Sequence, residues 1–130
     1  MYLITGCAGF IGFHMCEFLL KKKHKVVGID NLNSYYSTKY KNHRVSLLKK
    51  NKNFKFYKYD LNQKKKISRL FSKNTFEKVL HFAAQPGVIY SYKDPKSYYK
   101  NNVNATDILI DQIKKNKIKN FIFSSSSSVY

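Results

Sequence analysis

The chain has 130 residues and a mass of 15.3 kDa, which is enough for one domain with a buried core and too little for two. Its 25 basic residues outnumber 7 acidic ones and give a formal net charge of +18. Because 23 of the basic residues are lysines, whereas recognition of phosphates and base edges favours arginine, we attribute the charge to an AT-rich coding sequence and expect no nucleic-acid partner.

Short apolar runs alternate with segments of helical periodicity along the chain. The runs predict strands at residues 2–4, 26–29, 54–59, 79–82 and 121–123. The periodic segments predict helices over 11–23, up to Lys50, around 67–71 and after Pro95, the last with Tyr99, Val103, Ile110 and Ile113 on one face. This alternation predicts an α/β fold, a Rossmann-like doubly wound parallel sheet of about five strands with flanking helices.

The cysteines and the N-terminal segment bear on location. Cys7 and Cys16 lack the spacing of a metal site or a CxxC motif, so we expect reduced thiols in the cytoplasm and no metal. The apolar stretch from Ala8 to Leu20 is followed, not preceded, by positive charges and is too short to cross a membrane. We therefore expect no export signal, no membrane anchor and no membrane partner.

A glycine-rich segment, residues 5–12, lies between the first predicted strand and the first predicted helix. Gly6 permits a tight turn, Gly9 lets a pyrophosphate approach the backbone, and Gly12 allows the helix to pack close to the sheet. Asp30 follows 18 residues after Gly12, at the end of the second strand, where its carboxylate can bind ribose hydroxyls and repel a 2′-phosphate. The pattern predicts a dinucleotide site that prefers NAD to NADP; the alternative is a glycine-rich turn beside a surface aspartate.

This segment resembles the opening of the extended short-chain dehydrogenase/reductase family, the NAD-dependent epimerases and dehydratases. Matching stretches follow in order at residues 28–36, 60–61, 81–85, 101–104 and 124–130, so the resemblance covers essentially the whole chain. Within the family the chain is most similar to the UDP-glucuronate 4-epimerase branch, through Asn33, Tyr35-Tyr36, residues 83–88 and the serine run Ser124 to Ser128.

The resemblance implies which residues bind NAD. The pyrophosphate would be held by Gly6, Gly9, Phe10, Ile11 and Gly12. The adenosine ribose would be held by Asp30 and Asn31, and the adenine bordered by Asp60 and Leu61. The channel near the phosphates and the nicotinamide ribose would be lined by Phe82, Ala83 and Ala84, with Asn101 and Ser124 nearby.

The resemblance also implies a catalytic role for Ser126, as the hydroxyl that hydrogen-bonds the 4-hydroxyl of the sugar. A hydroxyl both donates and accepts, so it can follow a proton that leaves the sugar oxygen. The alternative for the serine run is a flexible polar linker. Histidines His14 and His81 are interpreted as packing or solvent residues, and the lysine clusters 21–23, 64–66 and 114–119 as charges at helix C-termini and on solvated faces.

The activity implied is that of a nucleotide-sugar 4-epimerase, which removes the C4 hydride to NAD and returns it through a 4-keto sugar. The family's catalytic Tyr-x-x-x-Lys motif and substrate-binding region are expected beyond Tyr130, which itself matches the Val-Tyr that ends the serine strand. We therefore expect residues 1–130 to be an incomplete NAD-binding domain that is inactive alone. The resemblance implies a homodimer for the full-length enzyme, whereas for residues 1–130 alone we do not expect one.

Three alternatives stay open. A nucleotide-sugar 4,6-dehydratase is expected to have acidic residues where this chain has Ser127 and Ser128. A non-catalytic NAD-binding module would apply if the chain ends at Tyr130, and a nucleic-acid-binding protein would rest on charge alone. Ile89 stands where related epimerases have an arginine, which counts against an acidic sugar as the substrate.

Overall fold

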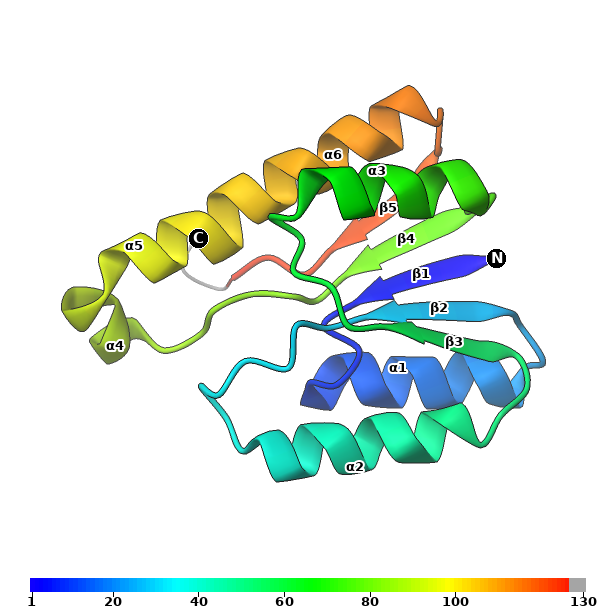
Figure 1. Ribbon diagram of the computed structural model, residues 1–130, viewed down its shortest axis with the longest axis horizontal. Coiled ribbons are helices and arrows are strands. Elements are labelled where there is room, and N and C mark those ends of the chain that lie inside the picture. Colours follow the sequence, from blue (N-terminus) through cyan, green and yellow to red (C-terminus); the bar gives the residue numbers. More distant parts are fainter. Residues whose placement is uncertain (127–130) are drawn as a thin grey trace.

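A computed structural model of the chain describes residues 1–126 (Figure 1). Its elements in chain order are β1 (Tyr2–Thr5), α1 (Phe10–Lys21), β2 (Val26–Ile29), α2 (Thr38–Lys49), β3 (Phe54–Tyr57), α3 (Lys64–Lys73), β4 (Lys78–His81), α4 (Val88–Lys93), α5 (Pro95–Tyr98), the π-helical turn η1 (Tyr99–Asn104), α6 (Ala105–Lys115) and β5 (Asn120–Phe123). The predicted alternation of strands and helices is confirmed, although the third strand ends at Tyr57 instead of Tyr59.

The strands form one parallel sheet in the order β3-β2-β1-β4-β5. The central strand β1 pairs with β2 and β4, so that Leu3 lies opposite Val27 on one side and Val79 on the other. After β3 the chain crosses to the opposite side of β1, and the loops after β1 and β4 therefore diverge. In such sheets ligands bind at the carboxyl ends of the strands beside this point, the left edge of the sheet in Figure 1.

Both faces of the sheet are covered by helices, α1 and α2 on one and α3 and α6 on the other (Figure 1). Adjacent side chains of a strand point to opposite faces. Ile4 accordingly packs in the same apolar cluster as Phe13 of α1. Leu3 packs with Ile67 of α3 and Leu109 of α6. Each fully buried side chain of this size contributes about 1.5–3 kcal/mol, which holds the helices and the strand ends in place.

The helical segment after Pro95 differs from the single regular helix predicted, because η1 interrupts it between α5 and α6. A π-turn bonds residue i to i+5, so side chains before it do not keep the α-helical register with those after it. Tyr99 and Val103 are 63% and 42% exposed, whereas Ile110 is partly buried and Ile113 is buried. The prediction of one shared apolar face is therefore wrong for Tyr99 and Val103.

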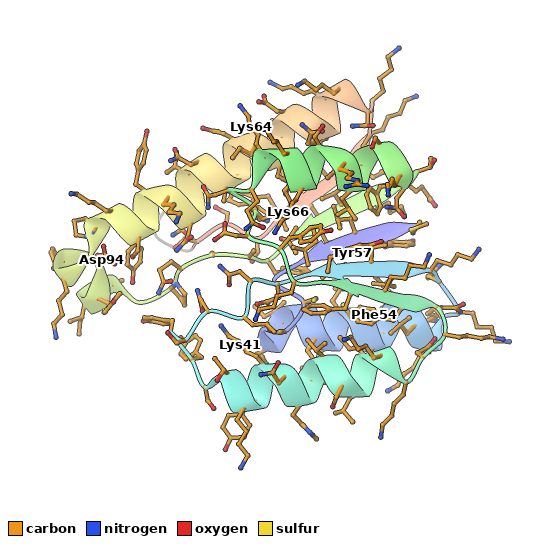
Figure 2. All side chains as sticks on the ribbon, viewed as in Figure 1. Lys41, Phe54, Tyr57, Lys64, Lys66 and Asp94 are labelled. Carbon is orange, nitrogen blue, oxygen red and sulfur yellow. The ribbon has the colours of Figure 1, made fainter. Side chains whose placement is uncertain are left out.

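Two further differences concern short helices. α4 is absent from the predicted elements because it buries none of its side chains and so has no apolar repeat to reveal it. The lysines Lys64, Lys65 and Lys66 form the first turn of α3 (Figure 2), so their assignment to a helix C-terminus is wrong. They are exposed, and the Lys66 ammonium lies 5.4 Å from the centre of the Tyr59 ring. Within residues 1–126, no helix has the length and apolar character needed to cross a bilayer.

Candidate functional site

The glycine loop joins β1 to α1 at the carboxyl edge of the sheet. Gly6 has φ +68°, and a Cβ there would stand 2.8 Å from the backbone nitrogen of Ala83. A Cβ on Gly12 would collide with the carbonyl oxygen of Gly6, which confirms that α1 packs too closely for a side chain. A Cβ on Gly9 would meet just one atom of the described residues within 4 Å, the Gly6 oxygen at 3.1 Å. Gly9 therefore presents its outer side to open space, where a ligand can approach the backbone.

The first turn of α1 has no side-chain cap. Gly9 precedes the helix, and its own amide bonds to the carbonyl oxygen of Gly6 at 3.0 Å. Phe10, Ile11 and Gly12, which form the start of the helix, all line the cavity, so the N-terminus of α1 lies at the cavity wall. An uncapped helix N-terminus with a positive dipole end favours a bound anion.

Asp30 ends β2 and is almost fully buried, with 9% exposure. Its Oδ2 accepts from the Ala8 amide at 3.1 Å, and its Oδ1 accepts from the Leu32 amide at 2.8 Å. The carboxylate thus ties the glycine loop to the end of β2. Each oxygen still has a second lone pair, so the group can accept ligand hydroxyls while it holds the loop.

Lys41, near the start of α2 (Figure 2), is a cavity-lining residue that the sequence patterns do not single out. It is 8% exposed, and its ammonium donates to the backbone oxygen of Asn33 at 2.9 Å and to Asn33 Oδ1 at 2.7 Å. Burial lowers the pKa of Lys41; the charge of Asp30 opposes this effect, and that of Arg44 adds to it. Arg44 itself donates to the Ala8 carbonyl oxygen at 3.1 Å, on the glycine loop.

Asp60 follows β3 on the same edge of the sheet. Its Oδ1 accepts from both the amide and the side chain of Asn62, at 2.8 and 2.9 Å, and its Oδ2 lies 3.4 Å from the Asn31 amide nitrogen. Partial burial acts to raise the pKa of Asp60, but these hydrogen bonds and the charge of Lys100 outweigh it and lower the pKa. The group is therefore a carboxylate at neutral pH.

His81 ends β4 and is 1% exposed. Its Nδ1 lies 2.6 Å from the Thr5 hydroxyl, and its Nε2 lies 2.9 Å from the Thr106 hydroxyl. Burial lowers the pKa of His81 to about 4. The interpretation of His81 as a packing residue is confirmed by its burial, and the structure adds that both ring nitrogens have partners. His14, in contrast, is exposed and lies 3.1 Å from Glu17.

The segment after β4 is held by Asn102 of η1. The Gln85 amide donates to Asn102 Oδ1 at 2.7 Å, and Asn102 Nδ2 donates to the Gln85 carbonyl oxygen at 3.0 Å. The next residue along, Pro86, offers its carbonyl oxygen to the Tyr98 hydroxyl at 2.6 Å. Gln85 is buried, and its Nε2 has no partner among residues 1–126. Neither Asn102 nor Gln85 is among the residues predicted to form the site.

These elements surround one cavity of about 320 Å³. All of the predicted cofactor-binding residues except Ser124 line it, and so do ten others: Ile29, Asn33, Tyr35, Tyr36, Lys41, Tyr59, Asn62, Gln85, Pro86 and Ala105. Ser124 continues the sheet instead, since its amide donates to the His81 carbonyl oxygen at 3.2 Å. Ser126 is exposed and is not among the lining residues. Ser127, Ser128 and Tyr130 lie outside the described residues, and residues 1–126 hold no cluster of side chains suited to a metal ion.

A parallel sheet, a glycine loop that opens a helix, and an acidic residue at the end of the next strand define a dinucleotide-binding Rossmann domain. Comparison with known families agrees, because the family described as GDP-mannose 4,6 dehydratase matches residues 3–130. The chain belongs to this family of NAD-dependent epimerase/dehydratase-like proteins.

Several relatives are 4-epimerases. The UDP-glucuronate 4-epimerase of Thermodesulfobacterium geofontis is 40% identical over 129 residues, which cover 99% of this chain and 40% of that protein. The crystal structure of the UDP-glucuronic acid 4-epimerase of Bacillus cereus, in complex with UDP-glucuronic acid and NAD, matches with a TM-score of 0.90 and 38% identity over 99% of this chain and 41% of that one. The structure of the UDP-Glc/GlcNAc 4-epimerase of Campylobacter jejuni matches with a TM-score of 0.87 and 35% identity. The match covers 98% of this chain and 37% of that one. The chain spans about two fifths of the length of these relatives.

Proposed function

We propose that the cavity binds NAD and that the chain is the NAD-binding part of a nucleotide-sugar 4-epimerase. The observation that carries the proposal is the convergence of the glycine loop, Asp30 and Asp60 on one cavity at the carboxyl ends of a parallel sheet. The crystal structure of the Bacillus cereus 4-epimerase, which contains NAD, supports it.

The residues present fit this cofactor from one end to the other. The space above Gly9 and the uncapped first turn of α1 suit the pyrophosphate, held by Gly6, Gly9, Phe10, Ile11 and Gly12. The lone pairs left on the Asp30 carboxylate suit the ribose hydroxyls, with Asn31 beside them. Asp60 and Leu61, which line the cavity, would border the adenine, and Phe82, Ala83, Ala84 and Asn101 would line the part toward the nicotinamide. Ser124 does not line the cavity. It follows the end of β5 and would approach the nicotinamide part of the site from there.

In the proposed reaction the chain supplies the cofactor site and one hydroxyl. When bound, NAD would provide the hydride acceptor and donor for C4 of the sugar. The Ser126 hydroxyl would hydrogen-bond the 4-oxygen of the sugar. Because a hydroxyl can both donate and accept, this bond could persist while the sugar hydroxyl loses its proton and regains it. The general base would belong to the Tyr-x-x-x-Lys motif expected beyond Tyr130, so residues 1–130 would show no epimerisation alone. Conversion of UDP-glucuronate or UDP-glucose by the purified chain, followed by NMR, would disprove this statement.

The sugar is either acidic or neutral, and one observation bears on the choice. Ile89, where related epimerases have an arginine, is 79% exposed beside a second hollow. Lys93 lines the same hollow and can supply the missing cation. The Lys93 ammonium could pair with the carboxylate of a sugar acid such as glucuronate. We therefore propose a UDP-linked acidic sugar as substrate of the complete enzyme.

Free buried thiols at Cys7 and Cys16 agree with a cytoplasmic location, and a homodimer is proposed for the complete enzyme.

The alternatives differ from this proposal in measurable ways. A 4,6-dehydratase, the reaction in the family's description, would accumulate a 4-keto-6-deoxy sugar in the complete enzyme where an epimerase accumulates none. A non-catalytic module would bind NAD with no turnover at any chain length. A nucleic-acid-binding protein would lose affinity steeply as salt rises.

The direct experiment is titration of the purified chain with NADH, followed by the fluorescence of the bound cofactor. We expect saturable binding that salt affects little. Gly9→Val should abolish it, because the branched side chain would occupy the space above the loop, and its Cβ would meet just one atom of the described residues within 4 Å. Ser72→Val, on the exposed side of α3, is the matched control and should bind as the wild type does. Equal binding by wild type and Gly9→Val would overturn the assignment of the cavity.

A further inference from the structure

Two loops at the carboxyl edge of the sheet meet over the cavity. The loop after β2 contributes Tyr35, and the segment after β4 contributes Gly87. A Cβ on Gly87 would collide with the Tyr35 hydroxyl, and Gly87 has φ +98°, a conformation that side-chain-bearing residues rarely adopt. The absence of a side chain at Gly87 thus allows the two loops to touch.

Tyr35 lies between the cavity and the second hollow, because it lines both. The cavity wall on one side includes Asn33 and Tyr36 of the first loop, and the wall on the other side includes Gln85 and Pro86 of the second. The contact of Tyr35 with Gly87 therefore joins the two walls of the cavity.

Ring contacts reinforce this junction. The Tyr35 ring packs edge-on against Tyr90 of α4 at a centroid distance of 5.3 Å, and against its neighbour Tyr36 at 4.8 Å. Tyr98 lies 6.4 Å from Tyr90, and its hydroxyl contacts the carbonyl oxygens of Pro86 and Gly87. Tyr98 thus holds in place the backbone that Tyr35 touches. Desolvation, followed by the nearby Tyr35 hydroxyl, raises the pKa of Tyr98.

We infer that Tyr35 is a positioning residue that closes the cavity over bound NAD and slows its release. The inference rests on the proposed function, that is, on NAD as the occupant. A reaction that removes and returns a hydride within one turnover leaves NAD in its starting state, so the enzyme has no need to exchange it. A contact that retains the cofactor then costs nothing in turnover and keeps the site loaded.

The test measures the rate at which NADH leaves the protein. The purified chain is loaded with NADH and mixed with excess NAD+ in a stopped-flow instrument, and the loss of bound NADH fluorescence gives the dissociation rate constant. Tyr35→Ala removes the edge-on contact with Tyr90, the ring contact of Tyr35 that joins the two loops, and should speed release about three- to tenfold. Tyr35→Phe keeps the ring that faces Tyr90 and Tyr36 but removes the hydroxyl that touches Gly87, so it should speed release less than Tyr35→Ala does.

A second variant addresses the same contact from the other loop. Gly87→Ala pushes against the Tyr35 hydroxyl and should also speed release. In a Tyr35→Ala background the collision is gone and only the strain of the positive φ is left, so the further acceleration should be smaller than the one that Gly87→Ala causes in the wild type. Tyr92→Ala is the matched control, since Tyr92 lies on the same α4 segment, is 83% exposed and lines neither hollow. Its release rate should equal that of the wild type.

The outcomes separate the two proposals. Failure of the wild-type chain to bind NADH overturns the proposed function, and the role of Tyr35 falls with it. Binding by the wild type with an unchanged release rate in Tyr35→Ala or Gly87→Ala overturns the role of Tyr35 alone. The same acceleration in Tyr92→Ala also overturns it, because the effect would then not belong to the contact.

Discussion

The Thr5 hydroxyl at the end of β1 lies 2.6 Å from Nδ1 of His81 at the end of β4. On the other side of the ring, the Thr106 hydroxyl donates to the Asn102 carbonyl oxygen at 2.7 Å, so it can only accept from His81 Nε2. The proton of the neutral ring therefore sits on Nε2, and Nδ1 accepts from Thr5. Thr5 in turn accepts from the Ala83 amide at 3.2 Å. One continuous chain of hydrogen bonds thus links the sheet to η1 behind the cavity.

The burial of His81 within these hydrogen bonds predicts that the free energy of unfolding depends on pH. Burial lowers the folded-state pKa of His81 to about 4, below the value of about 6.5 in an unfolded chain. Below pH 6.5 the unfolded state binds a proton that the folded state does not, so the free energy of unfolding falls as the pH falls and levels off near pH 4. Between pH 7 and pH 5 the loss should be about 2 kcal/mol, measured by urea unfolding. His81→Gln should lose much of this slope, and exposed His43→Gln should keep it. An unchanged slope in His81→Gln would contradict the assignment.

The glycines of the loop should respond differently to alanine. Gly12→Ala places a methyl group against the Gly6 carbonyl oxygen, a backbone atom that cannot turn away, and should lower the free energy of unfolding by about 1–3 kcal/mol. Gly9→Ala meets the same oxygen at 3.1 Å and needs an adjustment of a few tenths of an ångström, so it should cost less. Thermal unfolding of both variants measures the difference. Equal stability of the two would show that α1 can shift away from the loop.

Asp30 should decide the choice between NAD and NADP. Its carboxylate repels the 2′-phosphate, so the wild type should bind NADH more tightly than NADPH. In Asp30→Asn the ratio of the two dissociation constants should move by about tenfold toward NADPH, equivalent to about 1.4 kcal/mol. The neighbouring Lys41 ammonium would assist, because Asp30 no longer offsets its charge. The variant also leaves one backbone N–H without an acceptor, which lowers stability but cancels in the ratio. A ratio that does not change would remove Asp30 from the ribose site.

Asn102 should keep the segment after β4 well ordered, because it hydrogen-bonds the backbone of Gln85. Asn102→Ala removes both of its hydrogen bonds to the Gln85 backbone. The Gln85 amide should then lose protection from hydrogen exchange, with a drop in local stability of about 1–3 kcal/mol. Asn101→Ala, on the neighbouring residue, leaves these bonds intact and serves as the control. The Val27 amide, in the centre of the sheet, should exchange alike in all three proteins.

The glycine loop and Asp30 could be predicted from sequence because their function is local. The turn, the uncapped helix start and the acidic strand end follow one another within 30 residues, and each has a mechanical reason that the residue type alone reveals. The parallel sheet with helices on both faces likewise follows from the alternation of strands and helices, whereas the order of its strands comes from the structure.

Other parts of the site depend on residues that meet only in the folded chain. Lys41 is one of 23 lysines, and nothing local distinguishes it; its burial depends on Asn33 and on the neighbouring charges. The two partners of His81 lie 76 and 25 residues away from it. Ser124, which the family resemblance places near the cofactor, donates its amide to the His81 carbonyl oxygen at the end of the sheet, and its role stays a prediction. The role of Ser126 stays a prediction.

The π-turn η1 has a consequence for how this segment can vary in length. In an α-helix each residue turns the chain by about 100°. Deleting one residue between Tyr99 and Asn104 would restore regular α-helical geometry, but it would rotate Asn101 and Asn102 relative to α6, so that neither would keep its present direction. Substitutions on the exposed side of η1 should therefore be tolerated far better than insertions or deletions there. The spacing between Asp94, which caps α5, and Ala105, the buried first residue of α6, is under tighter constraint than the identity of most residues in between.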